Sequence, residues 1–248
     1  MFEMENGNSH MPFVTSDGFG GDARFCCIMV NGKWKLHCRI GSATAWKRIR
    51  TGLPEDATEC APTAQFEDGI WKISFIAGGF EGGRPFKLYR MYGLKSVPVV
   101  QEGADVGFVR KDIAVFANRR GPIYIKEPEY LLTLHLPAVQ FLYRVSYLPE
   151  RPNMLLISGK DLDDNLFSWA YLPRSKKLFA VIADGVPAYK CAIYRHRCYY
   201  AKKIGTDFED RKIVTAGKYT LDPLPDVKKY ISEEEDFIPA VTGLPELT

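Results

Sequence analysis

Two aspartates and a histidine stand just before short apolar segments, where their side chains could do chemistry. Asp22 precedes "ARFCCIMV", Asp105 lies in "GADVGF" and His135 lies in "LHLPAV". Two carboxyl groups can serve as general acid and general base when their environments separate their pKa values. Each aspartate also fits a plain turn residue, and His135 also fits a buried histidine that bonds to the backbone.

Thr63 and Asp184 occupy comparable places in the sequence. Thr63 lies in "CAPTAQF" and Asp184 lies in "DGVPAY", so small residues or proline again lead to an aromatic residue. For Asp184 a plain turn is the alternative interpretation. The shared pattern predicts that five residues gather at one ligand-binding face: Asp22, Thr63, Asp105, His135 and Asp184.

Five turns between apolar runs recur about 40 residues apart, and a further short strand is expected after each hairpin. Asn31-Gly32 and Asp68-Gly69 are the strongest turn signals, because both central residues of such turns need positive φ. The other three are Lys111-Asp112, a proline-rich turn near residue 152, and Arg195-His196.

A repeat of 40 to 45 residues with several strands in each unit is typical of a β-propeller blade. We therefore predict an all-β protein whose residues 16–225 form a five-bladed β-propeller of blades about 40 residues long. Residues 1–15 would be an N-terminal segment, and residues 226–248 an acidic C-terminal tail near one short helix in "PDVKKYISEEEDF". A β-sandwich is the alternative. Trp34 and Trp71, at matching places in their hairpins, are expected to pack between blades.

The layout resembles that of the five-bladed glycosidases of the arabinanase and β-xylosidase type. "CAPTAQFEDGIWKISF" is similar to the second-blade motif of that family. The resemblance implies that Asp22 is the general base and that Asp105 tunes the acid. The sequence departs from the family at two places: Thr63 replaces the motif's Glu, and His135 or Leu136 stands where the acid Glu is expected.

This departure governs the expected function, because inverting glycosidases need two carboxyl groups roughly 6.5–9.5 Å apart. We expect a non-catalytic binding or assembly protein whose partner is a glycan or another protein, for example a component of a phage or cell-surface assembly. The alternative is a divergent glycoside hydrolase that uses Asp22 and Asp105.

Composition argues against several other classes of protein. The 33 basic and 30 acidic residues give a net charge of +3, which is too small to indicate a nucleic-acid surface. No apolar run reaches the ~20 residues of a membrane span, and the first residues do not resemble a secretory signal. Six cysteines form no C-x-x-C pair, so we expect no metal site and no cofactor. Cys191 and Cys198 could face each other across a hairpin.

Overall fold

The computed structural model describes residues 13–16, 22–79, 85–110, 113–128, 130–148, 151–189, 191–194, 196–204 and 211–237. Within these residues the chain is built of short antiparallel strands and one four-residue helix. The strands form five sheets, each made mainly from consecutive segments of the chain. We number them sheet 1 to sheet 5 in chain order.

The first two sheets have four strands each, in sequence order. Sheet 1 consists of β1 (Phe13–Ser16), β2 (Asp22–Val30), β3 (Lys33–Ile40) and β4 (Lys47–Arg48). Sheet 2 consists of β5 (Thr58–Glu67), β6 (Ile70–Gly78), β7 (Lys87–Tyr92) and β8 (Val99–Gln101).

The next two sheets are larger, because each gains a strand from late in the chain. Sheet 3 consists of β9 (Val106–Arg110), β10 (Ile113–Ala117), β11 (Ile123–Glu127), β12 (Tyr130–His135) and β22 (Ser232–Phe237). Sheet 4 consists of β13 (Val139–Leu148), β14 (Arg151–Asp161), β15 (Leu166–Leu172), β16 (Lys177–Ala183), β17 (Val186–Pro187) and β21 (Tyr219–Pro223). Sheet 5 consists of β18 (Ala192–Tyr194), β19 (Arg197–Ile204) and β20 (Arg211–Gly217).

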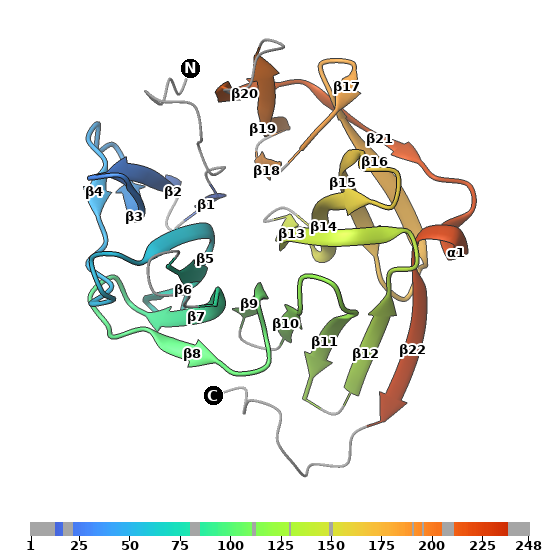
Figure 1. The fold of residues 1–248 in the computed structure, drawn as a ribbon, viewed down its shortest axis with the longest axis horizontal. Helices are drawn as coiled ribbons and strands as arrows, with labels where there is room; N and C mark the ends of the chain where they lie inside the picture. Colours follow the sequence, from blue (N-terminus) through green and yellow to red (C-terminus); the bar gives the residue numbers. More distant parts are fainter. Residues whose placement is uncertain are drawn as a thin grey trace.

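The sheets are arranged around a common centre in the manner of a β-propeller (Figure 1). Strands β1, β5, β9, β13 and β18 lie nearest the centre, and the later strands of each sheet lie further out. The all-β class and the propeller-like arrangement are thus confirmed. Four of the sheets have the four or more strands of a full blade, whereas sheet 5 has three among the described residues. The described residues therefore form four full blades, and the predicted number of five is not confirmed.

The two strongest turn predictions are confirmed, but the turns are not equivalent. Asn31 and Gly32 have φ of 49° and 75°, and Asp68 and Gly69 have φ of 52° and 79°. The first pair joins the second and third strands of sheet 1, whereas the second pair joins the first and second strands of sheet 2. The difference arises because Phe13–Ser16 forms an additional inner strand that the turn spacing did not indicate.

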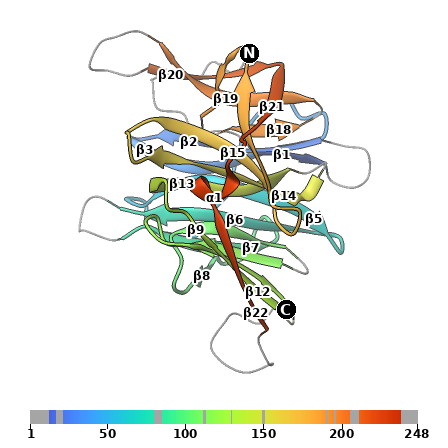
Figure 2. The same cartoon turned by 90° about the vertical axis from the view of Figure 1, so that its right-hand side faces the viewer.

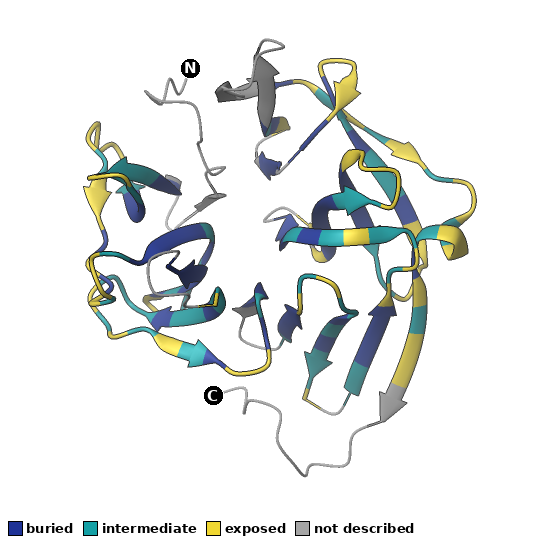
Figure 3. Cartoon of the chain, in the orientation of Figure 1, coloured by how far each residue is buried: buried dark blue, intermediate teal, exposed yellow. Residues whose placement is uncertain are grey.

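Among the residues whose burial is described, buried ones are concentrated toward the centre and exposed ones in the outer strands and turns (Figure 3). Trp34 and Trp71 are 8% and 6% exposed, which confirms their predicted burial. The Phe25 ring of sheet 1 lies 5.1 Å from the Trp71 ring of sheet 2, in an edge-to-face contact. This contact packs one sheet against the next, as expected for neighbouring propeller blades.

The chain from residue 219 to residue 237, which includes the described part of the predicted C-terminal tail, runs along the outside of two sheets. Strand β21 pairs with β16, the short helix α1 (Val227–Tyr230) follows, and β22 then pairs with β12 (Figure 2). The predicted helix therefore covers only four residues, because Ser232–Phe237 pairs with a sheet edge instead. Residues 238–248, the Lys111-Asp112 turn, Arg195 and most of the predicted N-terminal segment lie outside the described residues.

Candidate functional site

Asp105 stands immediately before β9, at the end of the molecule where the inner strand of sheet 3 begins. Its backbone N–H donates to the carbonyl of Ala117 over 2.9 Å. Its carboxylate Oδ2 accepts a hydrogen bond from the backbone N–H of Arg119 over 3.3 Å. Asp105 therefore braces the loop between β10 and β11, which carries Arg119.

Asp22 lies at the end of sheet 1 where the inner strand β1 ends, whereas Asp105 precedes the start of the inner strand of sheet 3. Asp22 is the first residue of β2 and pairs with Ser16 at the end of β1; its side chain lies outside the described residues. Three residues further on, Phe25 contacts Trp71, which follows the turn at the far end of β5. The additional strand β1 makes β2 the second strand of sheet 1. The Asp22 side chain lies outside the described residues, so its grouping with Asp105 at one mouth stays a prediction.

Thr63 lies inside the molecule rather than at its rim. It is in β5, beside a β-bulge at which Ala61 has a φ of 49°. The side chain is 3% exposed, and its hydroxyl has no hydrogen-bond partner within the described residues. Thr63 thus faces the packed interior and not an open ligand face.

Asp184 joins two sheets. It sits in the turn between β16 and β17 with a φ of 49°. Its carboxylate accepts hydrogen bonds from the Tyr200 hydroxyl over 3.0 Å and from the Lys218 backbone N–H over 3.2 Å. A side chain on Gly217 would collide with this carboxylate. These contacts agree with the alternative interpretation of Asp184 as a turn residue.

His135 ends β12, so it belongs to sheet 3 and precedes the inner strand of sheet 4. Its Nε2 lies 3.0 Å from the Glu234 carboxylate of β22. His135 also lines a cavity of about 320 Å³ between sheets 3 and 4. The polar side chains of this cavity come from Arg119, Arg120, His135 and Ser232.

Arg119 is held in place by two aromatic rings. Its guanidinium carbon lies 5.4 Å from the centre of the Phe86 ring and 5.3 Å from that of Phe141, distances typical of cation–π contacts. Its carbonyl accepts a hydrogen bond from the Leu142 N–H over 2.7 Å. Arg119 and Arg120 were not among the predicted site residues, although "NRRGP" between two expected strands marks an arginine-bearing turn.

The centre of the propeller-like arrangement is crossed by two side chains of β13. Arg144, which is 3% exposed, donates from Nη2 to the Pro62 carbonyl of β5 over 2.9 Å. The Tyr147 hydroxyl lies 3.3 Å from the Ala64 carbonyl of the same strand. Both contacts join sheet 4 to sheet 2, which are not neighbours in the chain order of sheets.

Burial makes the centre an unusual place for a cation. It lowers the pKa of Arg144 to about 10, while the nearby thiols of Cys191, Cys27 and Cys60 oppose this shift. Those thiols come from three different parts of the ring. Cys191 is hydrogen-bonded to Cys198, which lowers the pKa of Cys191 and raises that of Cys198. The two cysteines do meet near one hairpin, and both are free and buried.

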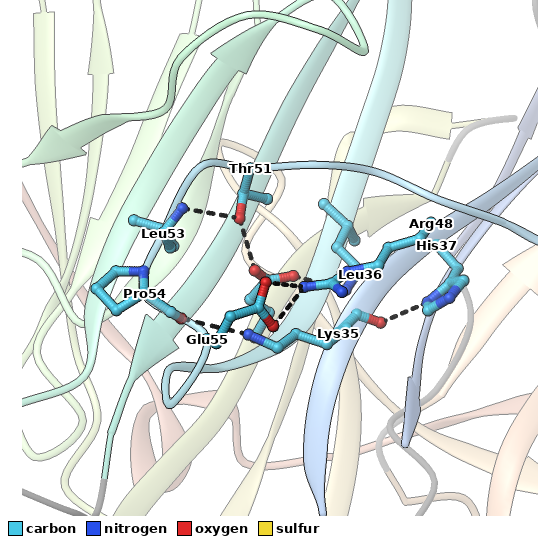
Figure 4. A network of polar contacts seen from close by, with 9 residues as sticks. Lys35, Leu36, His37, Arg48, Thr51, Leu53, Pro54 and Glu55 are labelled. Atoms are coloured by element: carbon cyan, nitrogen blue, oxygen red, sulfur yellow. Dashed lines mark hydrogen bonds and ion pairs between the residues drawn. The ribbon is translucent and has the colours of Figure 1, made fainter. Parts of the chain in front are cut away.

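A second buried polar network lies between β3 and β5 (Figure 4). Glu59, which is 1% exposed, accepts hydrogen bonds from the Leu36 N–H and the Thr51 hydroxyl, each over 2.6 Å. Lys35 donates to the Pro54 carbonyl over 3.4 Å. These bonds fix the connection between sheets 1 and 2, and both carboxylate oxygens of Glu59 are engaged in them.

Comparison with known proteins found no match for the chain among family models, curated proteins or solved structures. Among the described residues, no three His, Cys, Asp or Glu side chains gather closely enough to hold a metal ion. The same residues include no helix with the length and apolar character needed to cross a membrane.

Proposed function

We propose that the chain is a non-catalytic binding or assembly protein, built on a five-bladed β-propeller, whose partner is a glycan or another protein. In this proposal sheet 5 is the fifth blade. Its support is that β18 of sheet 5 contacts β1 of sheet 1 on one side and β13 of sheet 4 on the other. These contacts are the ones that a fifth blade would make in closing the ring.

The proposal of a non-catalytic role depends on the side chains that fill the centre of the molecule. Arg144 and Tyr147 cross from sheet 4 to sheet 2 at the place where propeller enzymes gather their reactive groups. Glycoside hydrolysis by inversion needs two carboxyl groups roughly 6.5–9.5 Å apart. The backbone positions of Asp22 and Asp105, at opposite ends of their sheets, do not favour such a pair.

A rigid ring of sheets suits a binding role, because many connecting loops meet at each end and little must be ordered when a partner binds. The end where β9 and β13 begin is the stronger candidate for contact, since the cavity with Arg119 and Arg120 opens there. Fold alone does not decide between activity and binding, so the proposal depends on a direct test.

The test compares hydrolysis with binding. Purified protein is incubated with aryl arabinosides and aryl xylosides and is also applied to a glycan array and to candidate protein partners. We expect that the protein releases no sugar from these substrates and that it binds a glycan or a protein partner. Proton donation to a leaving group contributes ~10²–10⁴-fold in rate, so a working hydrolase would be readily detected. Turnover that Asp22→Asn abolishes would reject the binding proposal and establish the divergent hydrolase.

A further inference from the structure

The cavity between sheets 3 and 4 is lined by two arginines, Arg119 and Arg120. Neither Arg119 nor Arg120 has a carboxylate within ion-pair distance among the described residues. By contrast, Arg48 is paired with Glu55, and Arg174 is paired with Glu127. Two arginines thus line one cavity, and no carboxylate of the described residues forms an ion pair with either of them.

Two carboxylates bond to residues that line this cavity, and neither does so through an arginine guanidinium. Asp105 accepts the hydrogen bond from the Arg119 backbone, and Glu234 lies against the His135 ring. Their negative charges reduce the local potential, but among the described residues neither carboxylate bonds to the guanidinium of Arg119 or Arg120. A guanidinium presents several donors in a fixed fork, which matches the two oxygens of a carboxylate.

The remaining lining fits a small organic molecule rather than a bare ion. Pro122, Leu136 and Leu142 supply apolar surface, while His135 and Ser232 supply polar atoms that can bond hydroxyl groups. The volume of about 320 Å³ lies at the lower end of small-molecule sites, about 300–1,000 Å³. Such a space accepts one sugar ring.

We propose that this cavity binds a sugar acid, with the carboxylate at Arg119 and Arg120 and the ring hydroxyls toward His135 and Ser232. The inference rests on the proposed binding function and specifies its ligand class. Arg119 would be the preformed contact, because Phe86 and Phe141 hold its guanidinium before any ligand arrives. Pre-organisation of this kind lowers the entropy lost on binding.

The experiment titrates the full chain with glucuronate and galacturonate and, as matched neutral ligands, with glucose and galactose. Calorimetry and saturation-transfer NMR measure the binding. We expect both acids to bind and both neutral sugars to bind at least tenfold more weakly. Arg120→Gln should weaken acid binding at least tenfold, whereas Arg48→Gln, whose arginine lies in sheet 1, should leave it unchanged.

Three results would overturn the inference: equal binding of acids and neutral sugars, no binding of either acid, or binding that Arg120→Gln does not alter. Binding of inorganic sulfate or phosphate in place of the sugar acids would reject the ligand class. Circular dichroism of each variant confirms that it is folded. Failure here leaves the hydrolysis assay untouched, so the two proposals can fail separately.

Discussion

The centre of the molecule and the cavity between sheets 3 and 4 use arginine in opposite ways. At the centre, Arg144 is almost completely buried and bonds to a backbone carbonyl of a distant sheet. At the cavity, Arg119 is half-buried between two rings, and Arg120 is exposed. The first arrangement joins parts of the protein, whereas the second places two arginines in the lining of a cavity.

The difference shows what separates a structural cation from a candidate ligand contact. A buried charge is costly unless protein groups satisfy it, so Arg144 must have its partners inside the fold. A cation at a cavity keeps its water and needs no such partner. Removing each arginine should therefore affect different properties, and the following predictions test this contrast.

The largest effect is expected from Arg144→Ala. The substitution removes a buried side chain and its bond to the Pro62 carbonyl, so the free energy of unfolding should fall by about 2–5 kcal/mol. Urea denaturation followed by tryptophan fluorescence measures it. Arg144→Met, which keeps much of the volume, should lose clearly less. An unchanged transition midpoint for the alanine variant would contradict the cross-sheet role of Arg144.

Arg119→Ala should have an intermediate effect on stability. The variant loses contacts with the Phe86 and Phe141 rings, each worth about 0.5–1 kcal/mol at a partly exposed site. We expect a loss of about 1–2 kcal/mol together with loss of sugar-acid binding. Arg119→Lys keeps the charge and should recover part of the stability. A fully stable Arg119→Ala protein would show that the stacking does not hold the side chain.

Tyr147→Phe should have a smaller effect at the centre. It removes only the hydroxyl near the Ala64 carbonyl and keeps the ring that packs 5.0 Å from Phe108. The expected cost is about 0.5–1.5 kcal/mol, measured by the same denaturation. A cost as large as that of Arg144→Ala would mean that the tyrosine, not the arginine, is the main link between sheets 4 and 2.

Arg120→Gln should have the smallest effect on stability and should act on binding alone. The side chain is exposed and has no ion-pair partner among the described residues, so the melting temperature should equal that of the parent protein within error. Differential scanning calorimetry tests this. A clear fall in melting temperature would place Arg120 with Arg144, as a residue that stabilises the fold.

Local signals in the sequence predicted the two tightest hairpin turns correctly, because such turns depend on short-range chemistry. Asn31-Gly32 and Asp68-Gly69 adopt the positive φ values that only a few residue types accept readily. The assignment of strands to places in a blade was less accurate. Phe13–Ser16 is short and lies before a glycine-rich stretch, so nothing local marked it as the inner strand of sheet 1.

The site was harder to predict, since it depends on which sheets meet. Thr63 and Asp184 carry suitable side chains, but one points into the core and the other joins two sheets. Arg119 becomes distinctive only when Phe86 and Phe141, from two other sheets, lie on either side of it. Arg144 carried a weak signal, as a single charge within the otherwise uncharged strand "FLYRVSYL".

The late strand β22 has a consequence for how the protein is made. His135 and Glu234, which meet across β12 and β22, are 99 positions apart in the chain. During synthesis at about 5–20 residues per second, the edge of sheet 3 stays unpaired for several seconds while sheets 4 and 5 emerge. Open edges of this kind invite association with other chains. The acidic run Glu233–Asp236 belongs to β22, the last strand to pair with this edge. A nascent chain that stalls before this run would leave the edge of β12 unpaired and open to aggregation.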